Sequence, residues 1–347
     1  MIRNAAWVVA VLLLDLRVGQ AQDTARPLFA QDATLELRVE APFKRLAQDT
    51  DDRDELDGVV RYRDSATGQE IALEAEIRVR GKSRLKLCDF PPLRIDFDRD
   101  ALDGTVFAGQ NHLKLATLCK RRDSSREDLI EEYEIYKAFN ALTDYSFRVR
   151  WLAVTYADTE DRDAEQFTEP AFFVEEDWEV AERNGLKALD VPRVELADLD
   201  KRAVALSSLF QFMIANVDWA ATQPAPDEKD CCHNGKPIGS AGRGVIVLPY
   251  DFDQSGLVSA AYARPMLDLR SVRERRYRGY CVANSEVGWA VQRFDERRTA
   301  IERIFDAETI DERTRGRTLD YIAKFYDIID DADARQRQIV ARCRGPD

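Results

Sequence analysis

The order of strand-like and helix-like segments constrains the fold of this chain more than any single motif does. Five segments of the first 120 residues alternate apolar and polar side chains, as half-buried strands do: 33–40, 58–63, 70–80, 92–97 and 112–117. From about residue 287 onward the chain is charged and has the periodicity of helices. This separation of strands from helices predicts an α+β protein.

The middle of the chain mixes both kinds of element. The expected elements are helices at 125–142 and 202–215, strands at 149–156, 171–175 and 245–250, and a long polar loop at 216–243. This order fits two lobes with a cleft between them. We place the boundary near residue 176, so that residues 22–176 form a β-rich lobe with one helix and residues 177–347 form a mainly helical lobe.

The N-terminus has the pattern of a signal peptide. Arg3 precedes an apolar stretch at 5–14, and Gly19 and Ala21 form a small-x-small cleavage pattern. That stretch is too short to cross a bilayer, and no later segment is apolar enough to do so. We therefore predict that residues 1–21 are removed and that the protein is exported, to the periplasm or beyond the cell, with no membrane span.

The cysteines agree with export. There are six, at 88, 119, 231, 232, 281 and 343, and an even number in an oxidising compartment predicts disulfides whose connectivity the sequence leaves open. Because Cys231 and Cys232 are adjacent, we expect them to bond to different distant partners. The chain has no C-x-x-C motif and only two histidines, His112 and His233, which argues against a structural zinc site.

Charge limits the partners of the protein. The 347 residues carry a net charge of −13 and contain no basic stripe with interleaved aromatic residues. Binding to a phosphate backbone needs clustered Lys and Arg side chains. We therefore exclude nucleic acid as the main partner.

Two acids follow the apolar strand that ends in PYDFDQSG. Asp251 and Asp253 are turn residues or metal ligands, since Asp is common in both settings. Asp218 follows a long apolar helix, and Asn234 lies between Asp218 and this strand. A carboxylate that orients a hydroxyl, followed by an Asn and an Asp that hold Mg²⁺, is the arrangement that phosphoryl transfer uses. The alternative for Asp218 is an acid at a helix end.

Other parts of a phosphoryl-transfer site also have candidates. Lys114, with Arg94 as its rival, is the candidate cation for phosphate, and Glu132 lies at the buried edge of a helical apolar stripe where it could hold that cation. Gly81 and Ser83 follow a strand, as in a phosphate-binding turn, and Glu175 and Glu176 fall where the backbone of a kinase hinge would contact a base. Each also has a structural interpretation, as a solvated side chain or an ordinary turn residue.

Four stretches resemble the CotH-like secreted kinases, an atypical protein-kinase-like family. They are IRVRGKSR (77–84), PLRIDF (92–97), NVDW…HN (216–234) and PYDFDQSG (249–256), the last similar to a P-[WY]-D-x-D metal-binding segment. The resemblance covers roughly residues 35–265. It implies a two-lobed atypical protein-kinase-like fold, with ATP and Mg²⁺ or Mn²⁺ as cofactors and a protein or small-molecule hydroxyl as acceptor.

The resemblance also implies roles for matching residues. Asp218 would be the catalytic acid/base, Asn234 a metal ligand in the catalytic loop, Asp251 the main ligand of Mg²⁺ and Asp253 an assisting ligand. This chain departs from the family at Trp219 and Ala220, where related loops often have His, and in its long Asp218–Asn234 spacing, which makes Gln223 a rival for the role of Asn234.

Three classes of function remain open at this point. The first is an exported kinase that transfers phosphate from a nucleotide to a Ser/Thr or other hydroxyl. The second is a catalytically impaired, pseudokinase-like envelope or binding protein. The third is a metal-dependent phosphohydrolase that uses the same acids.

Overall fold

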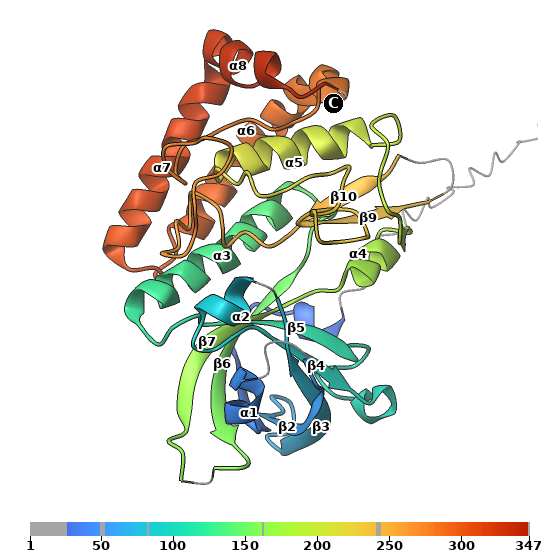
Figure 1. Cartoon of the computed structure of the whole chain (residues 1–347), viewed down its shortest axis with the longest axis vertical. Helices are drawn as coiled ribbons and strands as arrows, with labels where there is room; N and C mark the ends of the chain where they lie inside the picture. Colours follow the sequence, from blue (N-terminus) through green and yellow to red (C-terminus); the bar gives the residue numbers. More distant parts are fainter. Residues whose placement is uncertain (1–25, 49–52, 82, 162, 241–243, 346–347) are drawn as a thin grey trace, which may run out of the picture.

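The computed structural model describes residues 26–48, 53–81, 83–161, 163–240 and 244–345 (Figure 1). The expected signal peptide at 1–21 therefore lies outside the described residues. A seven-stranded barrel forms one end of the molecule, and a layered group of helices forms the other end (Figure 1).

The barrel contains all the long strands. They are β1 (Leu35–Ala41), β2 (Leu56–Arg63), β3 (Glu70–Val79), β4 (Leu93–Phe97), β5 (His112–Thr117), β6 (Val149–Asp158) and β7 (Phe167–Val174). Their order around the barrel is β1-β2-β3-β4-β5-β7-β6. Neighbouring strands are antiparallel except β1 and β6, which pair in parallel with Leu37 opposite Val154 and close the barrel.

Alternation along each strand fills the barrel. Leu37, Val60, Ile77 and Ile95, one on each of the first four strands, point inward and are fully or almost fully buried. Their neighbours along each strand face outward. Burying one face of each strand stabilises the sheet, and closure removes its exposed edges. Gly58 is required where β2 crosses β1, because a Cβ there would lie 2.8 Å from the Glu40 carbonyl oxygen.

Helices build the other end of the molecule. They are α3 (Asp123–Leu142), α4 (Asp177–Arg183), α5 (Lys201–Met213), α6 (Val287–Phe305), α7 (Glu312–Asp330) and α8 (Ala332–Gln338), while the short α1 (Phe43–Gln48) and α2 (Ser83–Leu87) flank the barrel. Short 3-10 turns lie at Pro27–Phe29, Arg99–Leu102, Cys281–Glu286 and Val340–Arg342. A separate antiparallel sheet has the order β10 (Ile246–Pro249), β9 (Gly235–Gly239), β8 (Lys187–Ala188).

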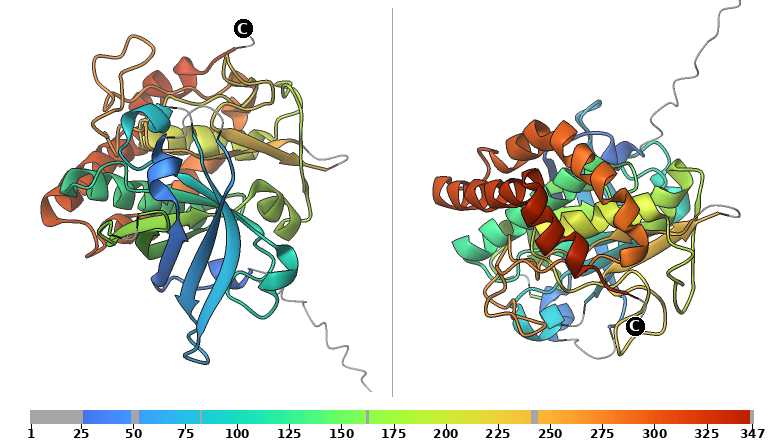
Figure 2. Two further views of the ribbon diagram at one scale, coloured as in Figure 1. Left: turned by 60° about the horizontal axis from the view of Figure 1, so that its bottom comes forward. Right: turned by 90° about the horizontal axis from the view of Figure 1, so that it is seen from above.

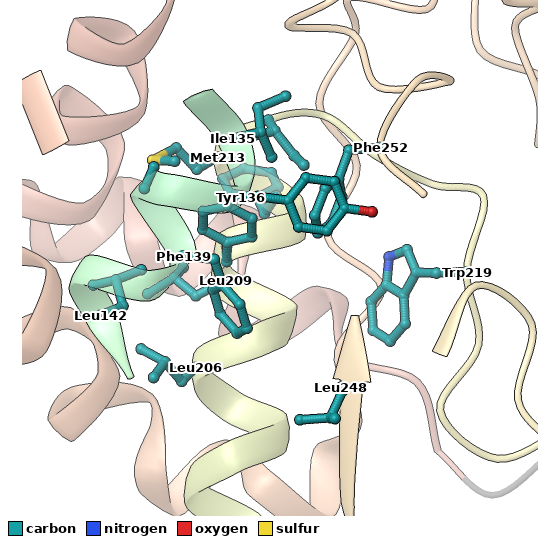
Figure 3. Packing of buried hydrophobic residues seen from close by; sticks show 14 of the residues in the cluster. Ile135, Tyr136, Phe139, Leu142, Leu206, Leu209, Met213, Trp219, Leu248 and Phe252 are labelled. Atoms are coloured by element: carbon teal, nitrogen blue, oxygen red, sulfur yellow. The ribbon is translucent and has the colours of Figure 1, made fainter. Parts of the chain in front are cut away.

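Helix α6 packs against α3, α5 and α7. Figure 3 shows the buried side chains of α3 and α5 facing each other, and the rings of Phe139 and Phe210 have centroids 4.6 Å apart. Phe294 of α6 and Phe325 of α7 extend this core, with ring centroids 5.1 Å apart. Figure 2 shows α6 and α7 covering the side of α3 and α5 that faces away from the barrel. This core is separate from the apolar cluster that fills the barrel.

The predicted two-lobed, protein-kinase-like fold is wrong. The strands close into a seven-stranded barrel with mixed pairing, and a small second sheet lies apart from it. The segments expected as strands are strands, but alternation does not determine which strand a given strand pairs with. The parallel pairing of β1 with β6 joins segments more than 100 residues apart, and it is this pairing that closes the barrel. The boundary proposed near residue 176 stays a prediction.

Three disulfides link the six cysteines. They join Cys88 to Cys119, Cys281 to Cys343, and Cys231 to Cys232. The expectation that Cys231 and Cys232 bond to distant partners is wrong, because the other four cysteines are brought together in pairs by the fold. Three disulfides fit an exported protein. None of the helices in the described ranges is both long and apolar enough to cross a membrane.

Several carboxyl groups on α3 and α4 are buried, and the cost of their burial outweighs the partners that they have, such as Arg317 beside Glu131 and Arg26 beside Glu179. Burial raises the pKa of Glu131, Glu134 and Glu179 to about 7 and that of Asp128 to about 6. Between the ordinary carboxyl pKa and about 7, the folded protein therefore binds more protons than the unfolded chain. Stability is then highest below this window and falls as the pH rises through it.

We predict that the unfolding temperature is higher at pH 5.5 than at pH 7.5. Glu134→Gln should raise the free energy of unfolding at pH 7.5 by on the order of 2 kcal/mol and weaken the pH dependence, because the neutral amide cannot ionise. Chemical denaturation at both pH values measures this. Glu302→Gln, on an exposed part of α6, is the control and should leave the pH dependence unchanged. Equal stability at both pH values would contradict the prediction.

Candidate functional site

A polar cavity lies where the barrel, α3 and the end of β10 meet. Its charged lining residues are Arg80, Arg84, Lys114, Glu132, Asp251 and Asp253. The cavity volume is about 70 Å³, which holds a few water molecules or an ion but not a whole nucleotide. A larger ligand would therefore place only its charged end here.

Arg84 is the centre of this cavity. Its Nη2 donates to Glu132 Oε2 at 2.9 Å and its Nε donates to Asp253 Oδ2 at 2.8 Å. Tyr262 donates its hydroxyl to the same Asp253 oxygen at 3.0 Å. Burial alone would lower the pKa of Arg84, but the surrounding carboxylates outweigh it and hold that pKa well above its usual value. The guanidinium is therefore a permanent buried cation.

The chain places Arg84 through a turn and a disulfide. After β3, Gly81 adopts a φ of +91°, a conformation that other residues rarely adopt, and α2 begins two residues later. Cys88 N–H donates to the Arg84 carbonyl at the end of α2, and the Cys88–Cys119 disulfide ties this segment to the residues that follow β5. The disulfide thus helps to hold Arg84 of α2 opposite Glu132 of α3.

Asp251 and Asp253 reach the same cavity from the end of β10. Asp251 has a φ of +62°, and its N–H donates to the Tyr136 hydroxyl at 2.9 Å. Phe252 is fully buried between Tyr136 and Phe210, with ring centroids 4.8 and 5.8 Å away (Figure 3). Packing of this one ring therefore fixes the acids on either side of it.

Asp251 is a half-buried acid whose carboxylate accepts no hydrogen bond from the described residues. Burial, and then the charge of Asp253, raises the pKa of its carboxyl to about 8, against the opposing charge of Arg84. A left-handed backbone at a non-glycine residue costs roughly 1–3 kcal/mol and persists where surrounding structure imposes it. Both features are typical of a functional position.

A second polar group surrounds Asp218, which follows α5. His233 Nε2 lies 2.6 Å from Asp218 Oδ1, and Asn234 Nδ2 donates to the Asp218 carbonyl at 2.6 Å and to its Oδ2 at 3.2 Å. The hydrogen bond to Asp218 raises the pKa of His233. Both carboxylate oxygens of Asp218 are thus engaged, and its orientation is fixed.

The register of the small sheet joins the two groups. Gly235, the first residue of β9, pairs with Pro249, the last residue of β10, so Asn234 lies beside Tyr250. Tyr250 N–H donates to the Asn234 carbonyl at 3.3 Å. Asn234 also has a left-handed backbone, with a φ of +47°. Asn234 therefore contacts both Asp218 and the residue before Asp251. The charge of Asp251 also contributes to the raised pKa of His233.

Of the remaining candidates, Lys114 and Gly81 line the cavity, and Arg94 and Glu175 do not. Lys114 lines the cavity, but its Nζ pairs with Glu176 at 2.8 Å and not with Glu132, and burial lowers its pKa. Arg94 pairs with Asp96 and approaches Glu176, outside the cavity lining.

Glu175 is also outside the cavity. It accepts hydrogen bonds from Arg183 and from the Arg148 N–H, a structural role at the end of β7. Gly81 lines the cavity, while Ser83 is the first residue of α2 and its side chain lies outside the described part of the chain.

Sequence reasoning missed Arg84 and Tyr262, and it expected of Glu176 a backbone contact to a base and not the ion pair with Lys114. Arg84 was hidden in the basic run RGKSR, where nothing distinguishes it from a solvated cation. Glu176 directly follows Glu175, and the capping box that it forms with Glu179 at the start of α4 is a signal that could have identified it.

A divalent cation fits the acids of this cavity. Among the described residues, no three His, Cys, Asp or Glu side chains lie close enough together to hold a metal ion. Mg²⁺, however, is usually held by one or two carboxylates and completed by water and substrate phosphates. Asp251, whose carboxylate lacks a hydrogen-bond donor among the described residues, and Asp253 supply such a pair.

We predict that the buried ion pairs of Arg84 determine stability as well as the site. Arg84→Met leaves Glu132 and Asp253 without their cation and should cost about 3–5 kcal/mol of unfolding free energy. Adding Glu132→Gln should restore part of the loss, and chemical denaturation of both variants measures the coupling. Additive effects of the two substitutions would show that Arg84 and Glu132 do not interact.

No protein-family model matches the chain, and no curated protein resembles it in sequence. The resemblance of its four stretches to CotH-like kinases thus stays a prediction.

Proposed function

We propose that this chain is an exported, CotH-like phosphotransferase that uses a nucleotide, with ATP as the expected donor and Mg²⁺ or Mn²⁺ as the metal, to phosphorylate a hydroxyl acceptor. One observation carries the proposal. Residues from α2, α3, β5 and the end of β10 line one cavity, the Asp218 loop is hydrogen-bonded through Asn234 to the residue before Asp251, and these are the residue types that phosphoryl transfer requires. The proposal rests on these side chains and not on the fold.

The cavity suits the phosphate end of a nucleotide. Asp251 and Asp253 are the residues that would hold the metal ion, and the ion would neutralise phosphate charge. Arg80 and Lys114 add cationic groups to the same lining, and Gly81 leaves backbone accessible because nothing lies within 4 Å of where its Cβ would be. The small cavity volume agrees with a site that takes phosphates and leaves the base and sugar outside.

Asp218 is the group we assign to the acceptor. Its carboxylate would accept the hydroxyl proton while the acceptor oxygen attacks the terminal phosphorus and the bond to the leaving nucleotide oxygen breaks. His233 and Asn234 hold the carboxylate in one orientation. Proximity of this kind contributes mainly by positioning the reacting atoms.

A second candidate is a nucleotide-binding protein without transfer activity. The observation that favours it is that both oxygens of Asp218 already accept hydrogen bonds within the protein. A carboxylate held in this way is a weaker base toward an incoming hydroxyl.

We predict that ATP with Mg²⁺ or Mn²⁺ stabilises the oxidised protein against thermal unfolding. At a nucleotide concentration about 100 times the dissociation constant, binding adds about 2.7 kcal/mol and raises the unfolding temperature by a few degrees. Asp251→Asn should abolish this shift, because it removes a charge that binds the metal.

The matched control is Asp268→Asn. Asp268 has nearly the same backbone conformation, with a φ of +60°, but is exposed and outside the cavity lining. It should keep the full shift. Absence of any shift in the unsubstituted protein, or an equal loss in both variants, would refute nucleotide binding at this cavity.

We predict that Asp218→Asn separates binding from transfer. The variant should keep the nucleotide-dependent thermal shift but lose at least about 100-fold in phosphate transfer, the usual contribution of a positioned base. Transfer of labelled terminal phosphate to a hydroxyl acceptor measures this. A thermal shift without transfer in the unsubstituted protein would support the binding protein, and phosphate release without acceptor labelling would support a phosphohydrolase.

A further inference from the structure

A groove rich in arginine lies at the helical end of the molecule, away from the cavity. Five arginines line it, at positions 275, 276, 278, 342 and 344, together with one acid, Glu274. The groove has a volume of about 690 Å³, much larger than the polar cavity. A chain with a net charge of −13 thus collects five positive charges around one groove.

A disulfide assembles this groove from two distant segments. Cys281 and Cys343 are 62 residues apart, and their bond holds the segment with Arg342 and Arg344 against the segment with Arg275 to Arg278. Arg344 N–H donates to the Gly279 carbonyl at 2.7 Å, and Cys281 N–H donates to the Arg344 carbonyl at 2.8 Å. The C-terminal end lies beside α8, at the end of the molecule opposite the barrel (Figure 1). The five cations are therefore held together covalently.

The positive charges of the groove are not neutralised within the described part of the chain. None of the five arginines forms an ion pair there. Their hydrogen-bond partners are neutral carbonyl groups: Arg275 donates to the Met213 and Tyr321 carbonyls, and Arg344 donates to the Arg278 carbonyl. Burial, and then the charge of Arg344, lowers the pKa of Arg278 to about 10. Like charges are thus held together against repulsion, and an anion would relieve it.

The groove reaches the loop that carries Asp218. Arg278 donates to the carbonyl of Val217, the residue before Asp218. Arg344 stacks over the ring of Trp219, the residue after it, with its guanidinium carbon 5.5 Å from the ring centroid. A molecule bound among these arginines would therefore lie next to the group that we assign to the acceptor hydroxyl.

We propose that this groove binds an acidic segment of a polypeptide acceptor, an inference that rests on the phosphotransfer function proposed above. Guanidinium groups bind carboxylates through paired hydrogen bonds, and the exposed Leu267 and the buried Phe212 give the same groove apolar surface. A short acidic peptide matches both features. A long polyanion fits less well, because the rest of the protein is strongly negative and would repel it.

Binding of a labelled peptide tests this inference without nucleotide or metal. The probe is a fluorescein-labelled, glutamate-rich peptide with one serine, and the reference is the same peptide with every glutamate replaced by glutamine. Fluorescence anisotropy at about 0.15 M salt should show binding of the acidic peptide only. Arg276→Gln with Arg342→Gln should weaken it by about tenfold or more, since two exposed charged contacts are lost.

The control variant is Arg297→Gln with Arg313→Gln. Both arginines are exposed on α6 and α7, neither pairs with an acid among the described residues, and the double variant removes the same two charges. It should bind the acidic peptide as the unsubstituted protein does. Equal weakening in both double variants, or equal binding of the two peptides, would overturn the proposal. Tighter binding of a single-stranded oligonucleotide of the same charge would also overturn it.

The two proposals can fail separately. Peptide binding without any nucleotide-dependent thermal shift would leave the groove assigned and refute the phosphotransferase. A nucleotide-dependent shift with no peptide binding would refute the acidic acceptor alone. Where transfer occurs, the Arg276→Gln, Arg342→Gln variant should raise the KM for the acidic acceptor and leave kcat unchanged, because these side chains bind the acceptor away from the reacting atoms.

Discussion

The buried ion pairs of Arg84 are the interaction on which the rest of the site depends. One guanidinium joins α2 beside the barrel, α3 of the helical layer and the segment after β10, through Glu132 and Asp253. These elements are far apart in the chain, and two separate apolar cores hold them. Because an unpaired charge in this position would cost several kcal/mol, the pairs fix the distance between barrel and helices at the cavity.

The cavity lining carries three cations and three acids, but they are not paired one to one. Arg84 is shared by two carboxylates, and Lys114 pairs with Glu176, so Asp251 has only the charges of Arg84 and Arg80 near it and no hydrogen-bonded cation among the described residues. A stable core would replace such an acid with an apolar side chain. Its retention, in a left-handed conformation, is easiest to understand if a cation and phosphate groups complete the balance when the site is filled.

The sequence predicted local structure well and pairing poorly. The helix expected at 125–142 is α3 (Asp123–Leu142), and the strand expected at 58–63 lies within β2 (Leu56–Arg63). Periodicity reports the environment of a segment but not its neighbour, so the closure of β1 on β6 and the strand β9 were not foreseen. The same limit applies to the site. Asp218, Asn234 and Asp251 were predicted from chain order and their roles stay predictions, whereas Arg84 became a candidate only through the contacts that the fold creates.

The loop around Asp218 lies between two regions of opposite charge. On one side, Asn234 links Asp218 to the acidic end of β10, which would attract a cation. On the other side, Arg278 donates to the Val217 carbonyl and Arg344 stacks over the Trp219 ring, and these arginines would attract an anion. Two covalent links brace this loop: Cys231–Cys232 lies directly before His233, and Cys281–Cys343 holds Arg344 over Trp219. The role that we propose for Asp218 would benefit from this rigidity, because misplacement of reacting groups by even about 1 Å is costly. In an exported protein disulfides can supply that rigidity, and here they add to the packing of Trp219, Cys231 and Cys232 in the core of the helical layer.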